Sequence, residues 1–273
     1  MGILLTIDVG NTNIALGMMN DDRVVSSFRL TTKTPRTSDE YGICLREMMN
    51  SAGVTKEDID DVIISSVVPK IMYSLNSAII KYVGKTPIIV GPGIRTGISI
   101  RTENPKEVGA DRIVDCAAAF YTYHTSCIIV DFGTATTFDC VSTDGTFLGG
   151  AIAPGMKTQA AALFEHTAKL PNVDLEIPGK FIARNTTEGM QSGLVYGHMG
   201  FTEHMVNGMK QEMSRELGCD PDSIKVIATG GMATMVESGV DCIDVIDRRL
   251  TLDGLQMLHE KNKGLNKKRV LQD

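Results

Sequence analysis

A chain of 273 residues has room for one large or two medium domains, and an apolar content of 42% allows a substantial core. The formal net charge of −6 and the pI of about 5.4 argue against a general nucleic-acid-binding protein, which would present a basic face. The basic tail, Lys261 to Arg269, is more typical of a solvated chain end, and the lack of Trp disfavours a stacking platform for single-stranded nucleic acid.

The first predicted element is an apolar strand, residues 3–7, that ends in Asp8 and continues into a loop of Gly10 and the polar residues 11–13. A second apolar run, residues 14–19, follows directly, so the loop joins strand to strand, whereas the Rossmann and Walker glycine loops open a helix. Such a loop offers backbone N–H groups and hydroxyls to an anion, and an adjacent carboxylate suits Mg2+. Taken alone, an ordinary hairpin turn explains the pattern equally well.

The remainder of the first half alternates between helix and strand patterns. Ser38 marks a helix start, Pro69 opens another helix, and Gly91-Pro92-Gly93 makes a sharp turn. We expect strands or extended segments at 23–30, 61–68, 87–90 and 98–102, and helices at 41–51, 69–82 and 105–123.

The second half repeats the opening of the first. Residues 128–139 again contain an apolar run, an Asp (Asp131), a glycine two residues later (Gly133) and a Thr-rich loop, about 120 residues after Asp8. That spacing suits a duplicated domain and is far too long for a solenoid repeat. We expect strands at 126–139, 146–152, 226–228 and 243–246, and helices at 155–169, 188–218, 232–238 and 250–261.

This order of elements predicts the fold class. Three antiparallel strands followed by alternating helix and strand, twice over, differ from the all-parallel alternation of a Rossmann fold. The pattern favours an α/β protein made of duplicated ribonuclease-H-like (actin-like ATPase) domains with mixed sheets. We place the domains at residues 1–118 and 119–273, and we expect the active site in a cleft between them, with the two Asp loops face to face.

The two aspartates are candidates for a phosphate site. Carboxylates there hold cations that neutralise phosphate oxygens, and the loop residues around Asp8 and Asp131 would cradle the phosphates. The alternative is that both acids cap turns. Gly230-Gly231, between a strand and a helix, would let an adenine ring lie close to the backbone, although a helix-start turn is equally consistent.

A second constellation is Gly109-Ala110-Asp111-Arg112 at a helix start. A carboxylate near a substrate hydroxyl can orient it and accept its proton, and a guanidinium can bind a carboxylate with two parallel hydrogen bonds. The pair Asp111 and Arg112 therefore suits a substrate that carries a hydroxyl and an acid group. A helix cap with a surface ion pair is the alternative. The five histidines are interpreted as structural or exposed.

Cysteine usage and the hydropathy pattern indicate the compartment. Six scattered cysteines without C-x-x-C lack metal-site spacing, and most lie in apolar runs, where Cys behaves as a small hydrophobe. No signal peptide and no apolar run long enough to span a bilayer is apparent. We therefore expect a cytoplasmic protein that binds neither membrane nor nucleic acid.

Together these motifs resemble the type III pantothenate kinases of the acetate kinase, sugar kinase, heat-shock chaperone and actin superfamily, over roughly residues 3 to 260. The motifs that carry the resemblance are DVGNTN (8–13), SSVVP (65–69), VGPG (90–93), ENPKEVGADR (103–112), IVDFGTATTFD (129–139), GGAIAPG (149–155), NTTEGMQSG (185–193) and IATGG (227–231).

The resemblance implies ATP-dependent phosphorylation of pantothenate to 4′-phosphopantothenate, the first step of coenzyme A synthesis. It also implies Mg2+, K+ or NH4+ as monovalent cation, and a homodimer. Asp111 looks like the catalytic proton acceptor, Asp131 the monovalent-cation ligand, and Asp8 part of the Mg2+ region. The implied ATP-binding residues are Asp8, Val9, Gly10, Asn11, Thr12, Asn13, Ile14, Ala15 and Thr134, and the implied pantothenate-binding residues are Gly109, Ala110, Asp111, Arg112 and Thr186, the last from across the dimer.

One position departs from the family pattern. Many relatives carry an aromatic residue at the position of Thr102, where it contacts the substrate, so the departure bears on substrate affinity. Two other functions stay open from the sequence: another phosphotransferase or ATPase of the superfamily, and a non-enzymatic transcriptional accessory protein. The negative net charge speaks against direct DNA binding by the latter.

Overall fold

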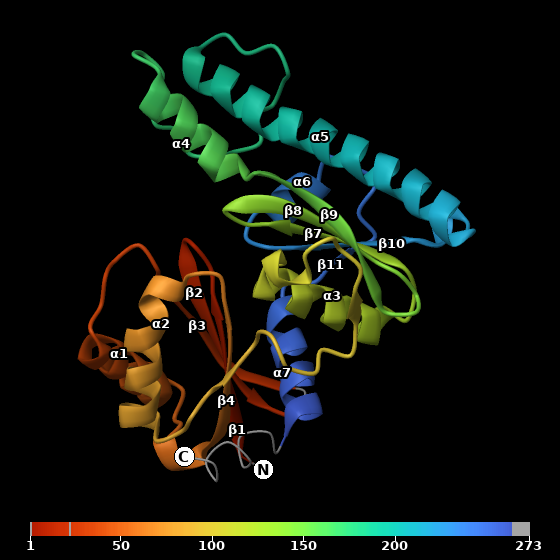
Figure 1. Cartoon of the computed structure of the whole chain (residues 1–273). Helices are drawn as coiled ribbons and strands as arrows, with labels where there is room; N and C mark the ends of the chain where they lie inside the picture. Colours follow the sequence, from red (N-terminus) through yellow and green to blue (C-terminus); the bar gives the residue numbers. More distant parts are fainter. Residues whose placement is uncertain (1, 22, 264–273) are drawn as a thin grey trace. The chain divides into compact units, whose positions relative to one another are not determined.

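The computed structural model describes residues 2–21 and 23–263, which form two compact units (Figure 1). The first unit contains the chain up to Gly97, residues 104–118 and helix α7 (Leu250–Asn262), and the second contains residues 98–103 and 119–249. The chain passes from the first unit to the second within α3 (Ala110–Tyr123), after residue 118. The range 1–118 includes residues 98–103, which belong to the second unit. The range 119–273 includes α7, which belongs to the first unit.

Strand pairing and helix packing explain these two exchanges. Strand β6 (Ser99–Ile100) pairs in parallel with β9 (Thr146–Pro154) of the second unit, whereas α7 packs on strands of the first unit. That the two halves are duplicated domains, with the active site in a cleft between them, stays a prediction. Residues 264–269 of the basic tail lie outside the described residues.

The first unit is built on a mixed five-stranded sheet. The strand order is β3-β2-β1-β4-β5; β1 is antiparallel to β2, β2 is antiparallel to β3, and β4 is parallel to both β1 and β5. The strands are β1 (Ile3–Val9), β2 (Asn13–Asn20), β3 (Arg23–Thr31), β4 (Ile59–Ser66) and β5 (Ile88–Ile89). Alternate residues of β1 join the apolar cluster with α1 (Ser38–Ser51) and α2 (Pro69–Ala78), so the others, including Asp8, point to the opposite face.

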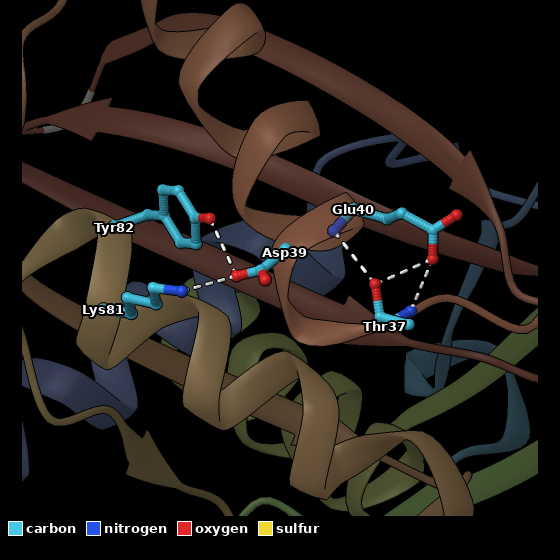
Figure 2. Close-up of polar contacts among 5 residues, drawn as sticks. All are labelled: Thr37, Asp39, Glu40, Lys81 and Tyr82. Carbon is cyan, nitrogen blue, oxygen red and sulfur yellow. Dashed lines mark hydrogen bonds and ion pairs between the residues drawn. The ribbon is translucent and has the colours of Figure 1, made fainter.

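Local hydrogen bonds define how α1 begins (Figure 2). A capping box satisfies its first turn: the Glu40 carboxylate accepts from the Thr37 N–H at 2.7 Å, and the Thr37 hydroxyl accepts from the Glu40 N–H at 3.3 Å. In the same turn, Asp39 Oδ1 accepts from Lys81 Nζ at 2.7 Å and from the Tyr82 hydroxyl at 2.8 Å. These bonds attach α1 to the π-helical turn 79–83 that follows α2.

The second unit is built on a mixed six-stranded sheet in the order β11-β10-β7-β8-β9-β6. Strands β7, β8 and β9 are antiparallel, and β10 is parallel to both β7 and β11. The bounds not yet given are β7 (Cys127–Phe132), β8 (Ala135–Val141), β10 (Lys225–Thr229) and β11 (Val245–Ile246). Each of the two sheets thus has a three-stranded antiparallel part extended by parallel strands, as the sequence pattern predicts.

Helices α4 (Met156–His166) and α5 (Thr186–Leu217) lie side by side in the second unit (Figure 1). The Asn185 side chain caps α5 by accepting from the Glu188 N–H at 2.9 Å, and Gly218 ends it in the left-handed region at φ 66°. The short helix α6 (Ala233–Glu237) follows β10. No helix among residues 2–21 and 23–263 has the length and hydropathy of a membrane span.

The observed elements confirm the mixed α/β class and correct three helix boundaries. The helix expected at 105–123 is a 3-10 turn, Pro105–Glu107, followed by α3 from Ala110, because residues 108–109 leave the helical conformation. The helix expected to reach residue 169 ends at His166. The long helix begins at Thr186, two residues before the expected start, because the cap is Asn185. The short helices Lys56–Asp58 and Pro221–Ser223 were not expected.

Candidate active site

The Asp8 loop is a tight connection between β1 and β2, and a threonine outside the loop stabilises it by hydrogen bonds. Asp8 is the penultimate residue of β1, and the Gly10 N–H donates to the Asn13 carbonyl at 3.0 Å. Thr32, which follows β3, donates through its N–H to the Thr12 carbonyl at 2.9 Å and through its hydroxyl to the Gly10 carbonyl at 2.8 Å. Sequence reasoning missed Thr32, since a single threonine after a strand carries no distinctive signal.

The residues of the predicted ATP-binding segment 8–15 differ in their exposure to solvent. Asn11 and Asn13 are exposed at the loop, whereas Val9 and Ile14 are fully buried in the core of the first unit. Ala15 lies opposite Asp8 in the β1–β2 register. Because Val9 and Ile14 point into the core, a ligand at this loop could reach them through their backbone groups alone.

Ser65 is a second residue that sequence reasoning did not select. It is the register partner of Asp8 in the parallel β1–β4 pair, so the two side chains share a face of the sheet. Ser65 is fully buried, and no partner for its hydroxyl is found among the described residues. The neighbouring Ser66 differs, because its hydroxyl accepts from the Val68 N–H at 3.1 Å.

The start of α3 lies against the end of β4. A Cβ atom at Gly109 would be 3.5 Å from Cγ1 of Val67 and 2.6 Å from Oδ1 of Asp111. The absence of a side chain at Gly109 therefore leaves the space in which the Asp111 carboxylate sits. Asp8 and Ser65 share a face near the ends of β1 and β4, and Gly109 brings the start of α3 to Val67, the residue that follows β4.

The Asp111 carboxylate is half-buried and hydrogen-bonded to the next residue. Its Oδ1 accepts from the Arg112 N–H at 2.8 Å. Burial raises the pKa of the Asp111 carboxyl, and the N–H and the positive charge of Arg112 oppose the rise. A raised pKa makes a carboxylate a stronger proton acceptor, so the predicted role is chemically consistent with this surrounding. Ala110 and Arg112, which flank it in the first turn, are half-buried.

The Asp131 loop of the second unit is enclosed by glycines. Asp131 is the penultimate residue of β7, as Asp8 is of β1, and lies in register with Thr229 of β10. A Cβ atom at Gly133 would be 3.3 Å from Asp131 Oδ2, and one at Gly230 would be 2.3 Å from Asp131 Oδ1. Gly230 also has a φ of 89°, so both its conformation and its space require glycine. The suggested contact of an adenine ring with this turn stays a prediction.

The start of α4 holds the same loop from the other side. The carbonyl oxygen of Thr134 accepts from the Gly155 N–H at 3.0 Å and from the Thr158 hydroxyl at 2.6 Å. A Cβ atom at Gly155 would lie 2.3 Å from the carbonyl oxygen of Gly133, so only glycine permits this approach. The Thr134 residue itself remains exposed. Thr186, the other candidate in this unit, is exposed in the first turn of α5.

Among residues 2–21 and 23–263, no three His, Cys, Asp or Glu side chains gather as a metal-binding group. Mg2+ in phosphate-transfer sites is usually held by one or two carboxylates together with phosphate oxygens and water. The donor sets of the two Asp loops fit that type of site.

Solved structures identify the fold. The chain is similar to a putative Baf family transcriptional activator from Campylobacter jejuni, with 18% identity, a TM-score of 0.58, and 94% of this chain and 98% of that chain covered. It is similar to a putative 2-dehydro-3-deoxygalactonokinase from Sinorhizobium meliloti, with 11% identity, a TM-score of 0.58, and 96% and 97% covered. It is also similar to the ethanolamine utilization protein EutJ from Carboxydothermus hydrogenoformans, with 13% identity, a TM-score of 0.51, and 94% of this chain and 90% of that chain covered.

These likenesses define the fold: the chain has a mixed α/β fold that it shares with these three proteins, one of which is a putative sugar kinase. The family follows from the sequence. A family model described as type III pantothenate kinase matches residues 4–208, and the chain belongs to this family. The match covers both Asp loops and the Asp111-Arg112 pair. Family membership supports a kinase that uses ATP, whereas the solved structures contribute the fold alone.

Proposed function

We propose that this protein is a pantothenate kinase, which transfers the γ-phosphoryl group of ATP to the primary hydroxyl of pantothenate and forms 4′-phosphopantothenate, the first step of coenzyme A synthesis. The observation that carries the proposal is the half-buried Asp111 carboxylate beside Arg112, at the start of α3, in a chain of the pantothenate kinase family. Pantothenate has both the hydroxyl and the carboxylate that this pair suits.

Asp111 and Arg112 have complementary roles in this proposal. The Asp111 carboxylate accepts a hydrogen bond from the substrate hydroxyl and takes its proton as the oxygen attacks phosphorus. The Arg112 guanidinium binds the pantothenate carboxylate with two hydrogen bonds. Gly109 and Ala110 contribute backbone groups to the substrate site. The missing side chain at Gly109 also leaves room for the Asp111 carboxylate. Catalysis then comes mostly from positioning and charge neutralisation.

The two Asp loops are assigned to ATP. Residues 8–15 and Thr134 bind the phosphates through backbone N–H groups and hydroxyls. Asp8 holds Mg2+ jointly with the phosphate oxygens, and Asp131, enclosed by Gly133 and Gly230, holds K+ or NH4+. When bound, these cations neutralise charge on the phosphate oxygens.

We further propose a cytoplasmic homodimer. Three large apolar side chains of the segment between α4 and α5 are exposed: Ile177 at 47%, Phe181 at 74% and Ile182 at 85%. A second copy of the chain would remove this surface from water, as dimer interfaces do. Thr186 follows the segment directly, and we assign it to the pantothenate site of the partner.

The test is release of ADP from purified protein with ATP and Mg2+, measured with and without pantothenate, in K+ and in Na+ buffer. The proposal predicts pantothenate-dependent release in K+ that collapses in Na+. Equal release in both salts would reject the cation role of Asp131 and retain the kinase. If folded protein released no ADP in response to pantothenate, the function would be wrong, and a panel of other acids and polyphosphate would identify a different phosphotransferase. DNA binding without turnover would favour the transcriptional role.

A further inference from the structure

His198 of α5 is a buried histidine joined to two other elements of the second unit. Its exposure is 2%, and the rings of Phe132 and Phe201 lie against it at centroid distances of 6.0 and 5.6 Å. Its Nε2 is 3.0 Å from the hydroxyl of Thr136 in β8, and its Nδ1 is 3.3 Å from the side-chain nitrogen of Gln159 in α4. The imidazole therefore bridges β8, α4 and α5.

The hydrogen bonds of Gln159 determine the tautomer of His198. The Gln159 amide nitrogen also donates to the Pro154 carbonyl at 2.8 Å, and the reversed amide would place two oxygens against each other there. The amide nitrogen is therefore the group that faces Nδ1, which must accept. The hydrogen of the neutral ring then lies on Nε2 and is donated to the Thr136 hydroxyl.

Both partners of His198 adjoin the Gly133–Thr134 loop. Thr136 is the second residue of β8 and pairs with Phe132 at the end of β7, so it lies just past the loop. Pro154 pairs with Ala135 and precedes Gly155, whose N–H donates to Thr134. The network thus supports the two strand ends that carry the loop and the helix start that holds it.

We propose that His198 is a positioning residue for the nucleotide-binding loop Gly133–Thr134, acting through Thr136 and Gln159. The assignment of this loop to nucleotide rests on the proposed function. His198 itself is buried and reaches the loop only through these partners, so its effect is on how well the loop is formed before ATP binds. A preformed loop binds more tightly because less conformational freedom is lost on binding.

The network requires a neutral imidazole. Protonation would put a hydrogen on Nδ1, facing the Gln159 amide hydrogens, and the hydrogen bond would be lost. In the described part of the chain, the recorded contacts of the ring from β7, β8, α4 and α5 are with Phe132, Thr136, Gln159 and Phe201, none of which is charged or titrates. Burial lowers the pKa of His198, so the neutral form persists below the ordinary histidine range.

The experiment measures nucleotide binding directly, with a fluorescent ATP analogue and Mg2+, and steady-state kinetics in parallel. His198→Phe fills the space without hydrogen bonds, and Gln159→Ala removes the hydrogen bonds of the Gln159 amide to His198 Nδ1 and to the Pro154 carbonyl. We expect each to raise the Kd for the analogue and the KM for ATP about three- to tenfold, as for the loss of a buried hydrogen bond, with the KM for pantothenate unchanged. His198→Gln, which retains a donor toward Thr136, should restore part of the affinity. His204→Phe, at an exposed position of α5, is the matched control.

The pH dependence separates positioning from general packing. The affinity of the wild type for the analogue should fall as the pH drops through the lowered pKa of His198, and this fall should be absent in His198→Phe. Unchanged affinity in folded His198→Phe and Gln159→Ala would overturn the proposal. If His198→Phe fails to fold, Gln159→Ala and His198→Gln decide it. A wild type that binds the analogue but does not phosphorylate pantothenate would refute the substrate, and the binding comparison would still decide the role of His198.

Discussion

Replacing Asp111 with Asn tests the proposed base. Asn has the size of Asp, keeps an oxygen that accepts from the Arg112 N–H, now 2.8 Å away, and fits the space that Gly109 leaves open. It cannot accept the substrate proton. Loss of a general base typically costs a factor of about 10² to 10⁴ in rate, or ~3–5 kcal/mol of barrier. We expect kcat to fall by that factor while the KM for pantothenate changes little.

The stability of the same variant gives an independent readout. Burial raises the pKa of Asp111, so its charged form is destabilised in the folded protein at neutral pH. Asp111→Asn should therefore have an unchanged or higher Tm near pH 8, measured by calorimetry alongside the ADP-release assay. Asp39→Asn, at the start of α1, is the control: it loses the ion pair with Lys81, keeps an oxygen that can accept from Lys81 and Tyr82, and should keep its turnover (Figure 2). Near-normal kcat in Asp111→Asn would refute the reasoning.

Three further predictions concern the same sites. Because the pKa of Asp111 is raised, kcat should fall as the pH decreases, and the fall should begin at a higher pH than for an ordinary Asp. The residual rate of Asp111→Asn should not show this fall. The same fall in wild type and variant would reject the assignment. Gly155→Ala places a Cβ 2.3 Å from the Gly133 carbonyl oxygen, so it should cost about 1–3 kcal/mol of stability and raise the KM for ATP. Gly200→Ala, in open space on α5, is the control and should not lower the Tm. Equal melting curves for the two variants would contradict the argument. Thr102→Tyr should lower the KM for pantothenate about two- to tenfold if a ring contacts the substrate there, and a raised KM would count against that contact.

Much of the fold could be predicted because local signals agree with it. Asp131 and Gly133 repeat the pattern of Asp8 and Gly10, and Pro69 marks the start of α2. Two assignments could not be read from order along the chain. Helix α7 packs on β1 and β4 of the first unit, and β6 pairs with β9, because long-range burial and pairing outweigh nearness in sequence.

The candidate site was predictable where chemistry is carried by an unusual residue type. Asp8, Asp111 and Asp131 stand out as acids beside apolar runs or glycines. Ser65 and His198 do not, since a serine in a strand and a histidine in a helix have many ordinary explanations. Their surroundings become visible only through the β1–β4 register and the packing of α4 and α5 on the second sheet.

The measurement that tests the central claim most directly is the identity of the product. Purified protein incubated with ATP, Mg2+, K+ and pantothenate should form 4′-phosphopantothenate, detected by mass spectrometry in step with ADP, and Asp111→Asn should form it at a rate lower by about 10² or more. ADP release without phosphorylated pantothenate, or equal product from wild type and Asp111→Asn, would contradict the account.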